Sequence, residues 1–337
     1  MKQNCLSTVL LAMCVAATVV AQPRTSYFEF TTNDFWLNLH HYLYVLGRAH
    51  SNAPDATQPA VATAPDDERR GLSLLTEEER QSWASAVDSY ARGISQKTSF
   101  FQPPLATMTI SLAKTGDVPA FPVATWNAAD REVLERAAPL YRKAWWTRHR
   151  AMNEQYVAEL QRTIDRDGPA IAAFLSRVYG MEWPNRPYPT HVVAYAIWQG
   201  AFSYTGRLLI LSSNSNVQND RWYPLETAFH ESMHQWDDRV APLLRAAATA
   251  HGVAVPPDLS HALVFFTVGD AVKRVHPDHI AVVDAFDIWR NPLSGSRVPS
   301  RRLQPPIQQI WKPYLDGRGS RDEAIDALVA AAAAATP

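Results

Sequence analysis

Residues Trp222 to Asp238 read WYPLETAFHESMHQWDD and contain the most informative motif of the chain. Within it, His230 and His234 stand four residues apart, and Glu231 directly follows the first histidine. On an α-helix, positions i and i+4 lie about 40° apart around the axis, so both imidazoles can bind one metal ion. Glu231 lies about 100° from His230, outside the ligand pair but close enough to reach a metal-bound water. The spacing therefore predicts two neutral nitrogen ligands and one adjacent base on a single helix.

The residues around this motif favour a helix. Pro224 suits the first turn, where its missing N–H group is not needed. No Gly or Pro interrupts the run from Leu225 to Asp238. Its apolar side chains can pack against a core, namely Ala228, Phe229, Met233 and Trp236. The competing interpretation is an amphipathic helix that carries the motif by chance, which would make the chain a helical binding module without a metal.

These residues resemble the signature of the zincin metallopeptidases, His-Glu-x-x-His. The metzincin continuation with a Gly and a third His is absent, since Gln235, Trp236 and Asp237 follow His234, and so is the aspzincin pattern Gly-Thr-x-x-Asp. What remains is similar to the gluzincins, and much of the chain resembles secreted bacterial proteins of predicted metallopeptidase type. The resemblance implies a zinc ion, a peptide or protein substrate, and an acidic third ligand on a later helix.

Asp270 is the predicted third ligand, because a catalytic zinc normally has three protein ligands and one position for water. On a helix it falls in an apolar stripe with Leu259, Leu263 and Phe266. A carboxylate in such a stripe is costly unless it is paired or bound to a metal. The alternative is an ion pair with Lys273 or Arg274, three and four residues later. Asp270 is one methylene shorter than the Glu that the gluzincin resemblance implies.

His261 is the rival third ligand and a candidate for contacting the substrate. It precedes Asp270 by nine residues and therefore lies on the opposite face of a straight helix. The resemblance also implies a Tyr or His from a later segment that stabilises the oxyanion of the reaction. Tyr314 is predicted for this role, with His261 as the other candidate donor. The alternative for Tyr314 is packing beside Trp311.

Several further polar residues stand near the motif or in the N-terminal part. Asp237 and Asp238 follow His234 closely and suit either support of an imidazole or a solvated helix end. Glu226, four residues before His230, has the same two interpretations. His40 and His41 are adjacent and point about 100° apart on a helix, so they cannot easily share a metal. Packing or surface positions are favoured for them, and lining of the active site is the alternative.

The composition excludes a nucleic-acid-binding protein of the usual basic type. The chain has 337 residues, of which 47% are hydrophobic and 19% charged, so it can bury a large core. Lys and Arg number 32 against 33 Asp and Glu, giving a formal net charge of −1. Nucleic-acid partners call for a strong basic excess, which is absent here.

The N-terminus has the pattern of a signal peptide, predicted to span residues 1–21. Lys2 precedes the apolar run from Cys5 to Ala21, which is short for a membrane span and ends in a Val-Val-Ala cleavage site. Both cysteines of the chain lie in this run, so the mature chain has neither disulfides nor thiol chemistry. We expect an exported bacterial protein, periplasmic or secreted, with no stable membrane insertion after cleavage.

The pattern along the chain predicts a mainly α fold with a small β-sheet, an α+β arrangement. A helical N-terminal part, 22–183, contains a loop or lid at 51–67 and precedes a zincin-like part, 184–337; one continuous domain, 22–337, is the alternative. Two strands are expected in the second part, His191 to Ile197 and Gly206 to Ser212. In gluzincin-like folds an edge strand pairs with the substrate backbone, and 208–213 is placed for that role, with an ordinary sheet strand as the alternative.

Local signals place the main helices. They are expected at 31–49, from a capping box at Thr76 to about Arg92, from Asn127 to about Val178 with a break, from Leu259 to about Val275, and after a capping box at Ser320. A helix was also expected to start at Pro242 and to end near His251.

The sequence thus predicts a zinc-dependent hydrolase, most readily a peptidase, with Glu231 as general base. The first alternative is a metal-binding protein of zincin fold without peptidase turnover. The second is the helical binding module without a metal.

Overall fold

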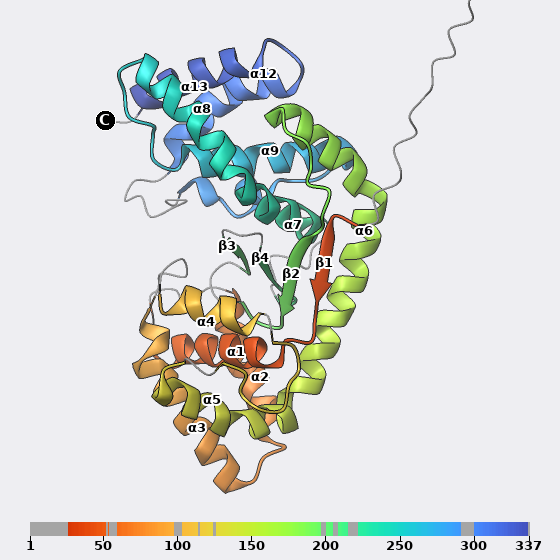
Figure 1. Ribbon diagram of the computed structural model, residues 1–337, viewed down its shortest axis with the longest axis vertical. Coiled ribbons are helices and arrows are strands. Elements are labelled where there is room, and N and C mark those ends of the chain that lie inside the picture. Colours follow the sequence, from red (N-terminus) through yellow and green to blue (C-terminus); the bar gives the residue numbers. More distant parts are fainter. Residues whose placement is uncertain are drawn as a thin grey trace, which may run out of the picture.

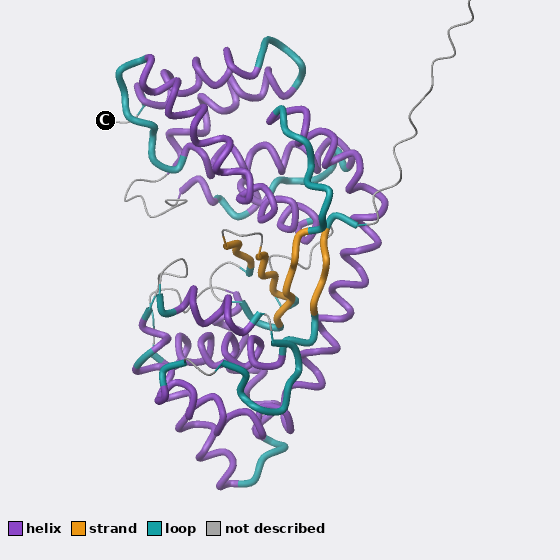
Figure 2. Tube along the Cα trace, in the orientation of Figure 1, coloured by secondary structure: helices purple, strands orange, loops and turns teal. Residues whose placement is uncertain are grey.

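The computed structural model describes residues 26–51, 53, 59–97, 103–113, 115–123, 126–196, 200–204, 208–214, 222–290 and 300–335. The predicted signal peptide, 1–21, lies outside these residues. The described chain is mainly helical with one four-stranded mixed sheet, which confirms the predicted fold class. Helices gather above and below the sheet when the long axis is vertical (Figure 1). The strands form a thin layer between the two groups of helices (Figure 2).

The sheet has the order β1-β2-β4-β3, with strands β1 (Phe28–Thr31), β2 (Tyr188–Val193), β3 (Ala201–Tyr204) and β4 (Leu208–Ser212). β1, β2 and β4 run parallel, and β3 pairs antiparallel to β4. Of the two interpretations of 208–213, the structure shows the ordinary sheet strand and not the edge strand, because β4 lies between β2 and β3. The strand at the sheet edge next to the motif helix is β3. It connects to β4 through only a few residues, and the sequence analysis predicts no strand there.

The sheet is buried on both faces and separates two hydrophobic cores. Alternate side chains of a strand point to opposite faces. Accordingly Val192 and Leu209 join the upper core, whereas Val193 and Ile210 join the lower core. Because β1 comes from the N-terminal part and pairs with β2, residues on both sides of the expected boundary at 183/184 build the same sheet.

The lower helical part consists of α1 (Phe35–His50), α2 (Pro59–Leu72), α3 (Glu77–Arg92), α4 (Leu105–Leu112) and α5 (Ala128–Tyr141). Two predicted starts are confirmed: Thr76 forms a capping box with Glu79, and the Asn127 side chain accepts two backbone N–H groups. The prediction of a loop at 51–67 is wrong from Pro59 onward, because α2 begins there. The helix predicted from residue 31 begins later, after β1, with Asp34 as its N-cap.

α6 (Thr147–Tyr179) runs along both helical parts on one side of the molecule (Figure 1). A π-helical segment, Arg142–Trp146, joins it to α5 without interruption, where the sequence predicted a break. The helix ends at Gly180, whose φ of 63° is the left-handed conformation that glycine adopts without strain. No helix in the described part of the chain is long and apolar enough to cross a bilayer.

The upper helical part carries the motif and begins with α7 (Tyr223–Met233), a 3₁₀ turn (His234–Trp236), α8 (Asp237–Ala250) and α9 (Leu259–Val275). It continues with α10 (Val282–Ala285), α11 (Gln304–Pro306), α12 (Lys312–Leu315) and α13 (Arg321–Ala334). The limits of α9 and the Ser320 capping box before α13 agree with the predictions. The helix expected to start at Pro242 instead begins at Asp237, with the proline inside it.

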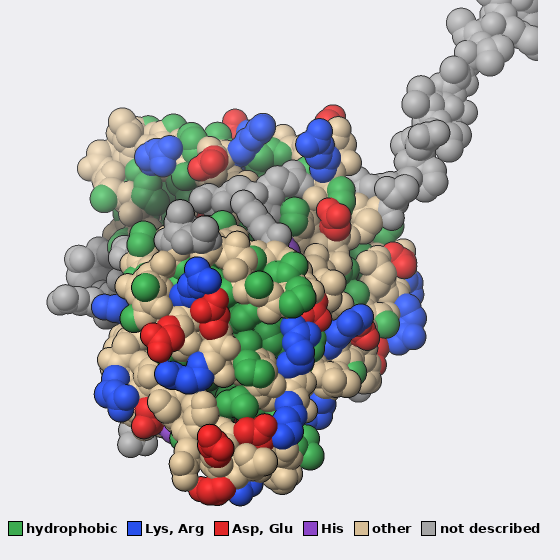
Figure 3. Space-filling view, turned by 60° about the horizontal axis from the view of Figure 1, so that its bottom comes forward, with side chains coloured by type: hydrophobic (Ala, Val, Ile, Leu, Met, Phe, Trp, Pro, Cys, Tyr) green, Lys and Arg blue, Asp and Glu red, His purple; other side chains and the backbone are tan. Residues whose placement is uncertain are grey.

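The surface has acidic and basic side chains interspersed. Figure 3 shows both kinds scattered over the face formed by the lower helical part, with apolar side chains between them. This mixture agrees with the formal net charge of −1.

Candidate metal centre

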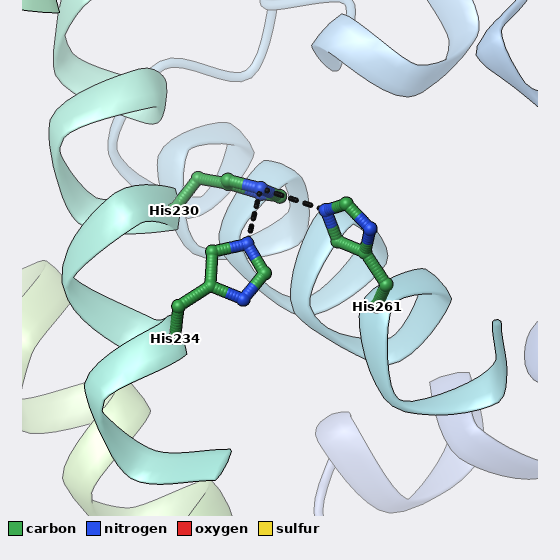
Figure 4. A group of neighbouring side chains, drawn as sticks. All are labelled: His230, His234 and His261. Atoms are coloured by element: carbon green, nitrogen blue, oxygen red, sulfur yellow. Dashed lines mark hydrogen bonds between the residues drawn. The ribbon is translucent and has the colours of Figure 1, made fainter. Parts of the chain in front are cut away.

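Two neighbouring helices bring three histidines together (Figure 4). His230 lies in the last turn of α7, His234 begins the 3₁₀ turn after it, and His261 lies in the first turn of α9. Among the described residues, these three form the one group of His, Cys, Asp or Glu side chains close enough to hold a metal ion, with one ligand atom from each within 4.8 Å of the others.

Nε2 of His230 lies close to Nε2 of both other histidines. Nε2 of His230 lies 3.1 Å from Nε2 of His234 and 3.2 Å from Nε2 of His261. A ring nitrogen has either one N–H or one lone pair. Nε2 of His230 therefore forms one good hydrogen bond at most, and the second close contact is left without a proton to share. A shared cation accounts for both contacts, because each nitrogen then directs its lone pair to the same ion.

The spacing fits a tetrahedral zinc ion. Zn–N bonds of about 2.0–2.1 Å at tetrahedral angles place two nitrogen ligands about 3.3 Å apart. The two observed distances lie within 0.2 Å of that value. Three imidazoles leave a fourth position for water or substrate. His230 is buried whereas His234 and His261 are half-buried, so the group is accessible from one side.

The protonation of the site favours metal binding at His230. Burial, together with the neighbouring His234 and His261, holds the pKa of His230 well below 6.5, so this imidazole is neutral. Burial also acts to lower the pKa of His234, but the hydrogen bond to Asp237 and the charge of Glu231 outweigh it and raise the pKa. Because metal ligands must be deprotonated, the raised pKa means that protonation competes with metal binding at His234.

Glu231 is buried beside the three histidines, with 6% of its surface exposed. Burial raises the pKa of its carboxyl to about 7, against the lowering effects of His234 and of a hydrogen bond with Ser203. Ser203 belongs to the edge strand β3, which packs against α7. The carboxyl therefore has a pKa near neutrality, which suits a group that accepts and returns a proton.

Residues next to the three histidines support their rings. Oδ2 of Asp237 lies 3.4 Å from Nδ1 of His234, and its other oxygen accepts a hydrogen bond from Ser260, the neighbour of His261. The Phe265 ring packs against His230 and His261, with centroid distances of 4.0 and 4.8 Å. The predicted supporting role of Asp237 thus has a geometric basis, because a hydrogen bond at the second ring nitrogen orients a histidine ligand.

The structure places the predicted third ligand, Asp270, in an ion pair instead. Nε of Arg274 lies 2.8 Å from Oδ2 of Asp270, and Nζ of Lys312 lies 3.5 Å from Oδ1. This is the alternative interpretation of Asp270, with Arg274 one turn later on α9. His261 takes the place of Asp270, because the two residues lie on opposite faces of α9 and the face that carries His261 packs against α7.

Tyr314 lies in the upper core rather than among the three histidines. Its hydroxyl donates a hydrogen bond to the carbonyl of Val178 at 2.5 Å, and its ring packs against Trp311 at 4.9 Å. The proposal that it stabilises an oxyanion is therefore replaced by the packing interpretation. His40 and His41 are likewise fully buried, in the lower core, and take no part in the group.

No protein-family model, curated protein or solved structure matches this chain.

Proposed function

We propose that this protein is a zinc-dependent hydrolase that cleaves peptide bonds. The single observation that carries the proposal is the convergence of three histidine Nε2 atoms beside a buried glutamate. His230, His234 and His261 would hold the ion, and Glu231 would act as the base. A bound zinc ion supplies a Lewis acid that polarises a carbonyl and lowers the pKa of water.

Glu231 would move the proton of the reaction. With a pKa raised to about 7 by burial, its carboxyl can take a proton from the attacking water and pass it to the leaving nitrogen. The positive charge of a metal ion nearby favours the carboxylate form and so prepares the base. Ser203 holds the same carboxyl from the strand side.

A peptide is the proposed substrate because an edge strand lies next to the three histidines. β3 ends the sheet at this side, and Ser203 on it contacts Glu231. The Gln235 side chain, next to His234, donates to the carbonyl of Tyr204 on the same strand at 2.9 Å. An extended peptide can add to a sheet edge by backbone pairing, which would align it along the metal ligands.

The test is metal analysis combined with digestion of a peptide library with and without chelator. We expect one zinc per chain and cleavage that chelation abolishes and zinc restores. Glu231→Gln should keep zinc and fold and lose cleavage, whereas His230→Ala should lose zinc. Zinc binding without any cleavage would make the chain a metal-binding protein without peptidase turnover. Purified protein that binds no zinc would reject the metal centre itself.

Export is the proposed localisation and rests on the N-terminal pattern alone. N-terminal sequencing of protein expressed in a bacterial host should give a start at Gln22 or within a few residues of it. A mature chain that still starts at Met1 would contradict export.

A further inference from the structure

α7 and α9 pack antiparallel, and the contacts between their residues recur at every helical turn. His234 at the end of α7 lies beside His261, with ring centroids 4.7 Å apart. One turn back on α7, His230 lies beside Phe265, one turn further along α9. One more turn along each helix brings Glu226 next to Gly269. The Glu226–Gly269 contact therefore lies about 12 Å along the helix axes from the His234–His261 contact, at a rise of about 1.5 Å per residue.

Glu226 is bound there by the segment that follows α9. It is 1% exposed, its Oε2 lies 2.5 Å from Nε2 of His279, and both its oxygens lie 3.1 Å from the backbone N of Val282. His279 is itself buried. One carboxylate on α7 thus binds a side chain and the first N–H of α10, and it ties the segment from His279 to Val282 to α7.

Gly269 lets these groups approach closely. A Cβ atom at this position would lie 2.5 Å from Cβ of Ala281 and 3.2 Å from Oε1 of Glu226. Ala281 immediately precedes Val282, and its Cβ is fixed to the backbone, so it cannot turn aside as a long side chain can. Any side chain at position 269 therefore has to push the segment at Ala281 away from α9.

We propose that Glu226, Gly269, Ala281 and His279 form a clamp that fixes the separation of α7 and α9 and so positions His261 against His230 and His234. The inference rests on the metal centre of the proposed function. Metal sites require their ligands within about 0.5 Å of the productive geometry. A shift of α9 away from α7 moves one ligand of the three and leaves the other two together.

A buried carboxylate is an expensive way to hold two helices together. A buried ionic pair contributes little net stability compared with apolar packing, and its best-attested use is to specify one arrangement among several. Glu226 binds the segment after α9 through directional hydrogen bonds, and Gly269 lets that segment pack directly on α9, so the two contacts together define the distance between α7 and α9. The clamp residues are therefore positioning residues: Glu226 lies one turn from His230 on α7, and Gly269 lies two turns from His261 on α9.

The test uses Co²⁺ in the full mature chain, because its visible absorption reports ligand number and geometry independently of activity. We expect Gly269→Ala and Glu226→Gln to weaken Co²⁺ and Zn²⁺ binding about 10–100-fold, the usual loss when a group behind the ligands is removed. Their Co²⁺ spectra should change in band position or intensity. His279→Gln, which keeps a donor, should bind metal better than His279→Leu.

Glu68→Gln is the matched control. Glu68 is also a buried glutamate bound to a histidine, with Oε2 3.2 Å from Nε2 of His50, but it belongs to α2 in the lower helical part. This variant should lose stability without any change in metal affinity or Co²⁺ spectrum.

Three outcomes decide the matter. Weakened binding with an altered spectrum in folded clamp variants, and not in Glu68→Gln, supports the clamp. Clamp variants that lose thermal stability but keep the affinity and spectrum of the parent overturn it. A parent protein that binds neither ion, with His230→Ala no different, rejects the metal centre and the clamp together. If Gly269→Ala does not fold, the metal affinities of His279→Gln and His279→Leu test the clamp in its place.

Discussion

Replacing Glu231 by Gln should stabilise the metal-free protein, relative to the parent, more at pH 8 than at pH 4.5. The carboxyl of Glu231 has an ordinary pKa of 4.5 and a pKa of about 7 in the folded protein, because burial disfavours its charged form. Below about pH 4.5 the group is protonated whether the chain is folded or not. As the pH rises through 7, the folded protein must accept a buried charge, and stability is lost.

The magnitude follows from the two pKa values. Each pH unit between them corresponds to about 1.4 kcal/mol, so the buried charge costs about 3 kcal/mol above pH 7. Gln has nearly the same shape and no charge, and it removes this pH-dependent term. The difference in unfolding free energy between Glu231→Gln and the parent should therefore grow by about 3 kcal/mol from pH 4.5 to pH 8.

Urea unfolding of chelator-treated protein across this pH range measures the difference. Glu78→Gln, at an exposed position on α3, corrects for the loss of one negative charge from the whole molecule. With zinc bound, the gain should shrink, because the ion stabilises the carboxylate form. A difference that stays constant within about 0.5 kcal/mol from pH 4.5 to pH 8 would refute the argument from burial.

Three further predictions test the third metal ligand, the role of Tyr314 and one helix cap. His261→Ala should abolish stoichiometric zinc binding while Asp270→Asn keeps it, as measured by metal analysis after dialysis; the reverse result would restore Asp270 as the ligand. Tyr314→Phe should cost about 1 kcal/mol of stability in urea unfolding, through the lost hydrogen bond to Val178, and leave kcat unchanged. Thr76→Ala should lower stability by about 1 kcal/mol through loss of the capping box, with zinc affinity unaffected, and an unchanged unfolding midpoint would show that the cap contributes nothing.

The lower helical part shows where sequence prediction succeeds and where it fails. The caps at Thr76 and Asn127 were predicted because a cap is a contact between residues two or three positions apart. The helix α2 was missed because its residues, 59–72, include prolines and many polar side chains, and its stability comes from packing against α1. β1 was missed because four residues form a strand only when a distant partner, β2, is present.

The motif helix with His230 and Glu231 follows from local sequence, and the four-residue spacing places His234 on the same side. The predicted run to Asp238 is wrong as one α-helix, because α7 ends at Met233 and His234 begins a 3₁₀ turn. The sequence also determined that His261 and Asp270 face opposite ways on α9, since nine residues correspond to two and a half turns. Only the tertiary structure decided which of them meets the histidine pair. The rotation of α9 about its axis depends on its contacts with α7, such as Phe265 against His230, and no local pattern in α9 contains that information. The position of β3 beside the site also depends on tertiary contacts. β4 pairs with β3 on one side and with β2 on the other, and the pairing with β2 joins residues distant in the sequence. β3 is therefore left at the edge of the sheet.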